Sequence, residues 1–184
     1  MWIDYVKSDL CRYVGVENVN IRSFLKNYFR NSGFKFSFWL RVKKFSKNKV
    51  VKGIATLQHY RLGKKYMLDI PASTDIGYGL FIGHGKCIVI NPTARIGNNV
   101  NLSQFTTIGS NHNQAATIGD NVYIGPSVCI VEDIQIDGNV KIGAGAVVTK
   151  DVPENATVAG VPAKIIKMND EPNSYINNRW EILS

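Results

Sequence analysis

The sequence predicts a mainly β protein, in which a parallel β-helix of hexapeptide repeats follows a small α-helical N-terminal region. Across residues 69–148 an aliphatic residue recurs at every sixth position in three runs, and seven of these residues are followed directly by glycine. A period of six with this glycine pairing is typical of a solenoid whose rungs stack and bury one continuous core. We call these aliphatic residues the ladder. It consists of Ile70, Ile76, Ile82 and Ile88, then Ile90, Ile96, Leu102 and Ile108, then Ile118, Ile124, Ile130, Ile136, Ile142 and Val148.

Residues 1–66 are predicted to be helical, because aliphatic and aromatic residues such as Phe24, Tyr28 and Phe29 recur there at helical spacing. The segment 31–33 (Asn-Ser-Gly) is expected to form a turn between two helices. Eleven of the nineteen aromatic residues fall in the first 45 positions, where lysines are interleaved with them. Such a stripe is either the packing face of a helix or a surface that lies against a membrane interface.

The net charge of +8 is unevenly distributed along the chain. Residues 1–69 hold 15 Lys+Arg and 4 Asp+Glu, a balance of +11, whereas residues 70–184 hold 7 and 10, a balance of −3. A basic end on a near-neutral solenoid indicates an anionic partner, such as a membrane surface, a phosphate-bearing lipid carrier or an anionic substrate. The alternative is an ordinary solvated helix surface. Nucleic acid is not expected as a partner, since no recognised binding motif accompanies the charge.

The composition is that of a soluble globular protein with one sizeable core. No apolar run reaches the length of a membrane-spanning helix. The N-terminus lacks the apolar core of a signal peptide, which predicts a cytoplasmic protein, and the basic N-terminal region leaves a peripheral contact with the inner face of the membrane open. Cys11, Cys87 and Cys129 are widely spaced without a CxxC pair, so reduced thiols are expected rather than disulfides or a zinc site.

The ladder is interrupted in two places. Its phase slips between Ile88 and Ile90, so one turn of the coil is expected to differ in length from the others. A longer gap before Ile118 leaves residues 109–117 (GSNHNQAAT) as an excursion loop. Insertions off a regular stack are frequent places for binding and catalysis, which makes this loop a candidate part of a functional site.

These patterns divide the chain into three regions. We expect a basic helical region at 1–66, a β-helix at 67–168 that carries the excursion loop, and a C-terminal tail at 169–184. The tail is polar and is expected to be loose, unless Trp180 and Ile182 dock it on a neighbouring surface.

His84 is the strongest catalytic candidate, since the flanking glycines Gly83 and Gly85 leave its imidazole accessible. A neutral histidine near pH 7 can take a proton from a hydroxyl nucleophile, which is usually worth about 10²–10⁴ in rate. Asp69 precedes it by 15 residues. One turn of a three-sided hexapeptide coil takes about 18, so this carboxylate falls on nearly the previous turn and could orient the ring. The competing interpretation of His84 is a surface turn residue.

Seven motifs between residues 69 and 164 carry a family resemblance. They are 69–71 (DIP), 82–85 (IGHG), 88–92 (IVINP), 102–109 (LSQFTTIG), 118–125 (IGDNVYIG), 142–153 (IGAGAVVTKDVP) and 159–164 (AGVPAK). Together they resemble the hexapeptide-repeat acyltransferases, most closely the serine acetyltransferase-like branch, over a little more than half the chain. The resemblance implies a left-handed parallel β-helix, acetyl-CoA as donor, a hydroxyl acceptor and a homotrimer with active sites between subunits.

The resemblance also implies roles for individual residues. It makes His84 the general base and Asp69 its carboxylate partner, and it places CoA in the groove between adjacent prisms. The residues that would line the pantetheine arm are Pro126 or Ser127, Ala144, Thr149 and Lys150, while Lys164 and Lys167 would meet the CoA phosphates. No metal is expected, because the metal-binding members of this fold use three histidines and one of the three here lies outside the ladder.

The chain departs from serine acetyltransferases in ways that bear on the acceptor. Those enzymes carry a second histidine before the rung that follows the excursion, whereas this chain has 114–117 (QAAT) there. His112 either substitutes for that histidine or has no part in the site. The helical region is also shorter and more basic than in the enzymes of cysteine synthesis. His59 and Arg61 are tentative acceptor contacts, with a structural role as the alternative for His59.

From these departures we expect an acetyl-CoA-dependent O-acetyltransferase that acts on a sugar hydroxyl in capsule, O-antigen or exopolysaccharide biosynthesis. His84 would deprotonate the hydroxyl and later protonate the departing thiolate. The first alternative is a serine O-acetyltransferase of cysteine biosynthesis. The second is a non-catalytic trimeric β-helix scaffold, in which His84 has no chemical role.

Overall fold

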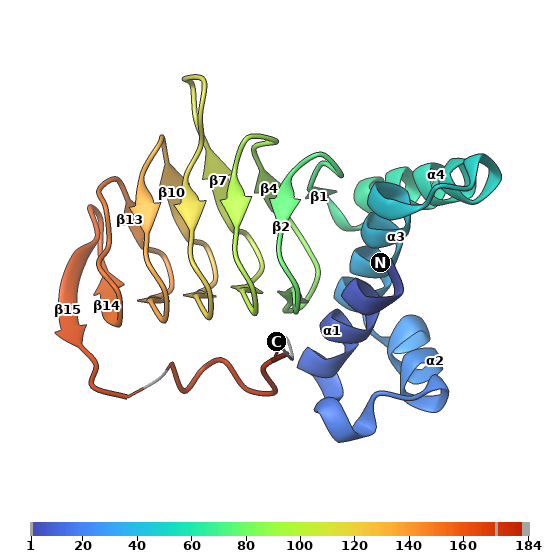
Figure 1. Cartoon of the computed structure of the whole chain (residues 1–184). Helices are drawn as coiled ribbons and strands as arrows, with labels where there is room; N and C mark the ends of the chain where they lie inside the picture. Colours follow the sequence, from blue (N-terminus) through green and yellow to red (C-terminus); the bar gives the residue numbers. More distant parts are fainter. Residues whose placement is uncertain (1, 172, 182–184) are drawn as a thin grey trace.

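The computed structural model describes residues 2–171 and 173–181, and these form a helical region followed by a β-helix (Figure 1). The described part of the helical region holds α1 (Trp2–Val14), the short 3-10 helix η1 (Val16–Asn18), α2 (Ile21–Arg30), α3 (Ser32–Phe45) and α4 (Lys49–Tyr66). None of the described helices combines the length and the apolar character that crossing a membrane requires.

Asparagines cap the N-termini of three of the helices. The side chains of Asn20, Asn31 and Asn48 each accept backbone N–H groups from the first turn of α2, α3 and α4, which satisfies donors that have no partner within the helix. The turn predicted at 31–33 is therefore shorter than expected, because Asn31 is the cap and α3 already begins at Ser32. Position 33 lies inside that helix and is a glycine, because a Cβ there would collide with the carbonyl oxygen of Ile82.

The β-helix has three parallel sheets, one on each face of a triangular prism. The strands are β1 (Leu68–Asp69), β2 (Asp75–Ile76), β3 (Phe81–Ile82), β4 (Ile88–Ile90), β5 (Arg95–Ile96), β6 (Asn101–Leu102), β7 (Thr107–Gly109), β8 (Thr117–Ile118), β9 (Tyr123–Ile124), β10 (Cys129–Val131), β11 (Gln135–Ile136), β12 (Lys141–Ile142), β13 (Val147–Val148), β14 (Ala156–Ala159) and β15 (Lys164–Met168). The first sheet runs β1-β4-β7-β10-β13, the second β2-β5-β8-β11, and the third β3-β6-β9-β12-β14-β15. Its last strand, β15, is antiparallel to β14 and closes the stack.

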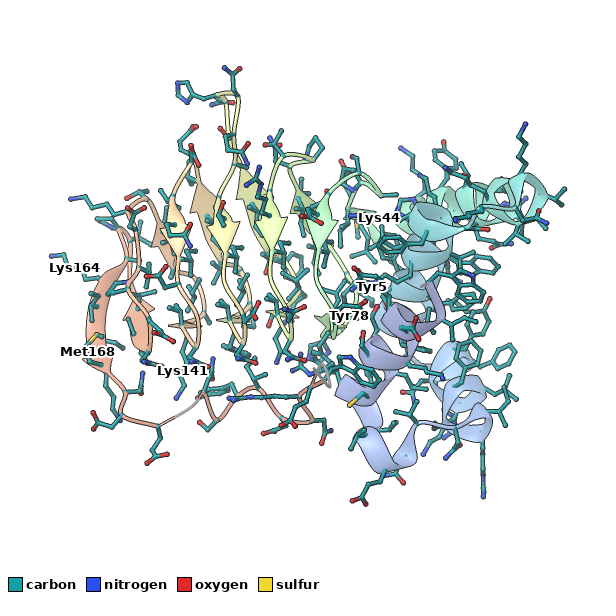
Figure 2. The ribbon with its side chains drawn as sticks, in the orientation of Figure 1. Tyr5, Lys44, Tyr78, Lys141, Lys164 and Met168 are labelled. Atoms are coloured by element: carbon teal, nitrogen blue, oxygen red, sulfur yellow. The ribbon has the colours of Figure 1, made fainter. Side chains whose placement is uncertain are left out.

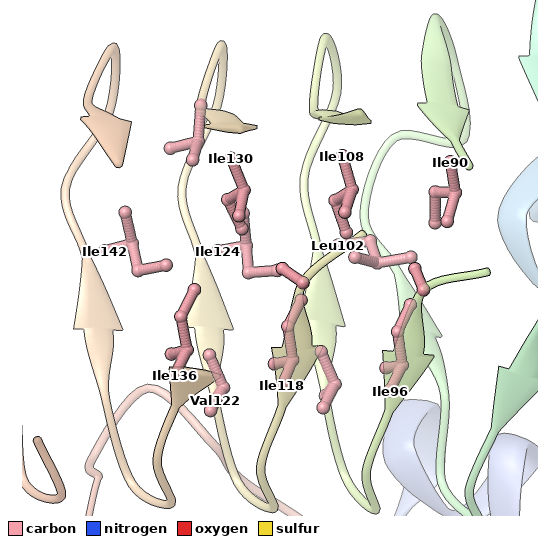
Figure 3. Close-up of a cluster of buried hydrophobic side chains, with 14 of the residues drawn as sticks. Ile90, Ile96, Leu102, Ile108, Ile118, Val122, Ile124, Ile130, Ile136 and Ile142 are labelled. Carbon is pink, nitrogen blue, oxygen red and sulfur yellow. The ribbon is translucent and has the colours of Figure 1, made fainter. Parts of the chain in front are cut away.

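The ladder side chains fill the inside of the prism (Figure 3), and each of them is at most 4% exposed. Successive rungs place isoleucine on isoleucine, as in the pairs Ile90–Ile108 and Ile124–Ile142, so every coil buries its apolar corner against the next. The predicted fold class is confirmed. It is a mainly β coil of hexapeptide repeats that follows a small helical region.

Two coils are longer than the 18 residues of a regular turn, as the ladder predicted. Leu68 pairs with Ile88 across a turn of 20 residues, because the phase slip adds two. Thr107 pairs with Cys129 across a turn of 22, because the excursion loop adds four. Both additions leave the ladder residues inside and displace only the connecting corners.

The helical region covers the open end of the β-helix. Phe36, Leu40 and Leu62 join the same buried cluster as the ladder, so one core runs through both regions. Polar groups seal this junction, where the hydroxyl of Tyr13 donates to the carbonyl of Ile82 and accepts from its N–H. Because the first coil would otherwise expose its apolar interior, the helices act as its cap.

The C-terminal tail is not loose, contrary to the prediction. Figure 1 shows it running back along the β-helix from β15 to the helical region. The buried side chain of Asn173 donates to the carbonyls of Asn121 and Val140, both at 3.0 Å. Further along, the backbone N–H of Trp180 donates to Asn99 Oδ1, so this residue docks on the chain's own β-helix. Ile182, the other predicted anchor, lies outside the described residues.

Candidate active site

One edge of the prism, between the third and first sheets, is built from residues in the left-handed backbone region. Backbone hydrogen bonds stack its corners, for example from the N–H of Phe105 to Lys86, of Ser127 to Gln104 and of Gly145 to Pro126. We call the stacked residues the corner column. It consists of Met67 (φ 55°), Cys87 (φ 54°), Phe105 (φ 61°), Ser127 (φ 58°) and Gly145 (φ 71°). This conformation turns the chain sharply between two sheets and points each corner outward.

His84 lies three residues before Cys87 of the corner column, in the turn that follows β3. Its φ is 59° and that of Gly85 is 51°, so the chain makes two successive left-handed steps there. A Cβ on Gly85 would lie 2.6 Å from the N–H of Gly33, which explains the glycine. Ser32 donates its hydroxyl to the His84 carbonyl at 3.4 Å. The α3 N-terminus therefore fixes the backbone, while the imidazole stays exposed to solvent.

Asp69 ends β1 and is exposed on the first sheet, directly across from Val89 of the next coil. Val89 follows His84 by five positions and belongs to the same coil. Asp69 and His84 therefore lie on adjoining coils at the same edge. In the part of the chain that the structure describes, no hydrogen bond joins the Asp69 carboxylate to the His84 ring. Their pairing as base and orienting carboxylate stays a prediction.

A groove of about 890 Å³ opens between α4 and the first coil, next to Asp69. It is lined by charged groups, by apolar side chains and by two glycines of α4. The lining residues are Lys43, Gly53, Thr56, Leu57, His59, Tyr60, Gly63, Lys64, Met67, Leu68, Asp69, Pro71 and Val89. The groove therefore brings both signs of charge together beside the predicted catalytic carboxylate.

His59 lines the groove but is held by structural contacts. Its Nε2 lies 3.1 Å from the carbonyl oxygen of Ile70, and its Nδ1 lies 3.3 Å from the Nζ of Lys43. Because a carbonyl only accepts and an ammonium only donates, these contacts select the neutral ring with its proton on Nε2. Burial lowers the pKa of His59, and the neighbouring Lys43 lowers it further. The other tentative acceptor contact on α4, Arg61, is exposed and does not line the groove.

The predicted CoA-binding residues gather near the two ends of β13. Ala144 lies at the corner before β13, while Pro126 and Ser127 lie at the corner before β10, one coil earlier on the same edge. The two corners stack, because the N–H of Gly145 donates to the carbonyl of Pro126 at 2.8 Å. A Cβ on Gly145 would meet nothing within 4 Å, so this corner faces open space. Thr149 and Lys150 follow β13 and are exposed at the next corner.

The predicted phosphate contacts lie on β15, at the end of the β-helix farthest from the helices, where Figure 2 labels Lys164. Lys164 pairs with Ala159 and Lys167 with Thr157, and both lysines are exposed. The N–H of Ala163 donates to Val147 at 2.8 Å, which brings the start of β15 to the corner before β13. Lys164, which follows Ala163, is thereby placed near the start of β13.

His112 occupies the tip of the excursion loop and is paired with Glu132, a residue that the sequence analysis did not single out. The His112 Nδ1 lies 2.7 Å from Glu132 Oε2, and the hydroxyl of Ser110 donates to the same oxygen at 2.7 Å. Hydrogen bonding to Glu132 raises the pKa of His112, and the same contact lowers the pKa of Glu132 to about 2. Twenty residues separate the pair along the chain, so only the stacking of successive coils brings them together.

The segment where a second histidine was sought is part of the framework. Ala115 and Ala116 are fully buried in the ladder core, and the side-chain amide of Gln114 donates to the carbonyl of Thr93. Among the described residues, no group of three His, Cys, Asp or Glu side chains is arranged to hold a metal ion.

Comparisons with known proteins identify the relatives of this chain. The family model described as bacterial transferase hexapeptide (six repeats) matches residues 115–150. The crystal structure of serine acetyltransferase from Neisseria gonorrhoeae in complex with serine is 32% identical, with a TM-score of 0.74 over 89% of this chain and 68% of that one. The chain belongs to the hexapeptide-repeat transferase family. Its coil therefore matches the left-handed β-helix of the serine acetyltransferase-like branch, as the resemblance implied.

Two further members of this family extend the comparison. The structure of serine acetyltransferase in complex with coenzyme A from Brucella abortus strain S19 is 29% identical, with a TM-score of 0.76 over 91% of this chain and 68% of that one. Serine acetyltransferase 3, mitochondrial, from Arabidopsis thaliana is 38% identical over 126 residues, which is 66% of this chain but 32% of that protein. The chain spans a third to a half of the length of the curated relatives it matches.

These comparisons correct the predicted acceptor. The relatives and solved structures named above are serine acetyltransferases, and one of those structures holds serine. The prediction of a sugar hydroxyl in polysaccharide biosynthesis is therefore wrong, and the alternative of a serine acetyltransferase is the better supported. The prediction gave too much weight to the missing histidine and to the short basic helical region.

Proposed function

We propose that this hexapeptide-repeat transferase is an acetyl-CoA-dependent serine O-acetyltransferase. The observation that carries the proposal is the shared edge of the prism. His84 lies at one end of that edge and the candidate CoA residues Ser127 and Ala144 lie farther along it. The likeness to transferase structures that hold serine and coenzyme A supports the same two ligands here.

In the proposed reaction His84 acts first as a base and then as an acid. The imidazole takes the proton from the hydroxyl of serine as the hydroxyl oxygen attacks the thioester carbonyl. Backbone N–H groups near the corner glycines stabilise the resulting oxyanion. The carbon–sulfur bond then breaks, and the imidazolium returns its proton to the departing thiolate. The products are O-acetylserine and free CoA, and the Asp69 carboxylate would stabilise the transient positive charge on the ring.

The two stacked corners before β10 and β13 suit an extended pantetheine arm. Their residues Ser127, Ala144 and Gly145 are small, and the space outside Gly145 is open. Exposed lysines at Lys164 and Lys167 supply positive charge for the phosphates of CoA. These features support the arm lying along the edge with its thioester end toward His84.

The groove next to Asp69 suits a small zwitterion. Lys43 and Lys64 offer ammonium groups for a carboxylate, and Asp69 offers a carboxylate for an ammonium group. A neutral sugar hydroxyl carries no charge to pair with these groups. Because His59 is tied to Ile70 and Lys43, we assign it to the wall of the groove rather than to the chemistry.

We also propose that the active protein is a homotrimer. Large apolar side chains are exposed beside the groove and along the edge, including Leu57 (50%), Met67 (62%), Val89 (46%) and Phe105 (56%). Neighbouring prisms packed edge to edge would bury these side chains. Each active site would then lie between two subunits, with His84 from one of them.

A two-part experiment tests this proposal. Release of free thiol from acetyl-CoA is measured with L-serine as acceptor, and binding of CoA is measured separately by calorimetry. We expect turnover with L-serine, and about tenfold weaker CoA binding after Lys164→Ala with Lys167→Ala, since each charge-assisted contact contributes substantially. Lys52→Ala, which removes an exposed lysine of α4, is the control. Absence of turnover with L-serine contradicts the proposed acceptor, and unchanged CoA affinity in the double variant contradicts the phosphate assignment.

A further inference from the structure

Helix α2 presents an apolar ridge to solvent that the proposed reaction does not use. Phe24 and Tyr28 face inward and pack with α1 and α3. Ile21, Leu25 and Phe29 follow one another at four-residue spacing on the adjoining outer face. Their exposed fractions are 72%, 47% and 73%, so two of the most exposed large apolar side chains of the described chain lie on this one ridge. Scattered exposed residues are ordinary, but a continuous ridge on one helix indicates a binding surface.

Basic side chains border this ridge on both sides. Arg22, Lys26 and Arg30 form an exposed row immediately beside it on α2. On the other side the Nζ of Lys35 lies 4.9 Å from the ring centre of Tyr28 and 5.7 Å from that of Phe29. The sequence of α2, IRSFLKNYFR, contains no acidic residue. An apolar stripe with lysine and arginine beside it is the pattern of helices that lie in a membrane interface.

The basic and apolar groups also share one concave surface. A cavity of about 950 Å³ opens beside α2, and Arg22, Lys26 and Arg30 line it together with Leu25 and Phe29. This volume is within the range of small-molecule sites, which extends to about 1,000 Å³, so the cavity is large enough for a phospholipid headgroup. The surface therefore matches both parts of an anionic lipid, its phosphate and the start of its acyl chains.

The charge argues against a second copy of the chain as the occupant. A two-fold contact through α2 would place Arg22, Lys26 and Arg30 against the same three residues of the copy. Like charges brought together in an interface are costly, and no acidic side chain of α2 is present to compensate for them. The balance of +11 over residues 1–69 also attracts an anionic surface from a distance.

We propose that α2 docks the protein on an anionic lipid bilayer. Ile21, Leu25 and Phe29 enter the boundary between headgroups and acyl chains, while Arg22, Lys26 and Arg30 contact lipid phosphates. The helix is only 10 residues long and lies in the plane of the interface. The β-helix then extends away from the membrane, because it leaves the helical region on the side away from α2 (Figure 1). This inference does not depend on the identity of the acceptor.

Vesicle co-sedimentation of the full chain tests the proposal. Phosphatidylcholine vesicles with and without phosphatidylglycerol are pelleted with wild-type protein and with variants, and the bound fraction is measured at low and high salt. We expect at least about tenfold stronger binding to the anionic vesicles, reduced by salt, because the basic row provides the attraction. Leu25→Ser with Phe29→Ser should weaken this binding by about tenfold or more, because each side chain buries apolar area in the bilayer.

Matched variants separate the ridge from general effects. Val50→Ser removes a side chain of α4 that is 72% exposed, and it should leave vesicle binding unchanged. Lys26→Glu should weaken binding to anionic vesicles much more than Lys52→Glu, although both variants change the net charge equally. Circular dichroism and the melting temperature report whether each variant keeps its fold.

Three results would overturn the proposal. The first is wild-type protein that does not pellet with anionic vesicles. The second is binding that the ridge variants and the control variants reduce equally. The third is a ridge variant that changes the oligomeric mass by light scattering while its vesicle binding stays that of the wild type, which would assign the ridge to contacts between copies of the chain.

Discussion

Arg41 of α3 and Asp9 of α1 form a buried two-point ion pair, with Nε and Nη2 of the arginine each 3.0 Å from one carboxylate oxygen. Both side chains are almost completely buried. The remaining N–H groups of Arg41 donate to the carbonyls of Ile76 and Gly77, and the N–H of Leu80 donates to Asp9. This single pair therefore joins two helices to the first coil of the β-helix.

Removing Asp9 should destabilise the protein strongly. Asp9→Ala leaves the Arg41 charge buried without its partner, which typically costs about 3–5 kcal/mol of unfolding free energy. Urea denaturation followed by circular dichroism measures the change. Glu17→Ala, which removes an exposed carboxylate of η1, is the control and should change stability by less than about 0.5 kcal/mol. Equal effects of the two variants would show that the ion pair does not hold the junction together.

His59 should make the fold less stable in mild acid. Its pKa is lowered in the folded state by burial, so the unfolded chain binds more protons once the pH falls below the ordinary value of about 6.5. The stability that the neutral ring provides is present above that value and is lost as the pH falls through the folded pKa. Unfolding free energies measured across this range should fall with pH, and His59→Gln should flatten the dependence. A His59→Gln protein with the wild-type slope would contradict this assignment.

The contribution of His112 should depend on pH in the opposite sense to that of His59. Because Glu132 raises its pKa, the pair is intact between the lowered pKa of Glu132 and the raised pKa of His112, and it is lost as the pH rises through the latter. NMR titration of the His112 ring should show a pKa above about 6.5, and Glu132→Gln should bring it back toward that value. Asp133→Asn, one residue further along, is the matched control. An unchanged titration after Glu132→Gln would mean that the pair does not form in solution.

Docking of the C-terminal tail should depend on the side chain of Asn173. Asn173→Ala removes both hydrogen bonds to the coil carbonyls, at a cost of about 1–3 kcal/mol. The carbonyl of Asn121 loses its side-chain donor, while that of Val140 still accepts the N–H of Tyr123. We expect faster proteolytic cleavage within the tail and a lower melting temperature. Asn177→Ala should have little effect, because that side chain is exposed. Equal cleavage rates for the two variants would contradict the docked tail.

Local periodicity was enough to predict the β-helix. Each ladder position, such as Ile124, is buried for a reason that its six-residue context already contains, and the two longer coils appear as breaks in the same count. The helical region was likewise predicted from spacing. Gly33 was misjudged as part of a turn, because the close approach of Ile82 that requires a glycine there is a contact between distant segments.

Pairs distant in sequence could not be predicted in this way. Asp9 and Arg41 are separated by 32 residues and His112 and Glu132 by 20, and nothing in the local pattern relates either pair. The tail was misjudged for the same reason, since a polar segment can dock through one asparagine such as Asn173. Prediction of the acceptor rested on two departures, the missing histidine of the excursion loop and the short basic helical region. In that loop Ala115 and Ala116 are core residues rather than part of a binding surface.

The central claim is tested most directly by steady-state acetyl transfer from acetyl-CoA to L-serine, measured for wild-type protein and for His84→Ala. We predict turnover by the wild type and a kcat at least about 10² lower in the variant, because the general base is lost. The variant should bind CoA as tightly as the wild type, and Glu17→Ala should keep full activity. A wild-type protein that does not acetylate L-serine, or a His84→Ala protein that does so at the wild-type rate, would contradict the account.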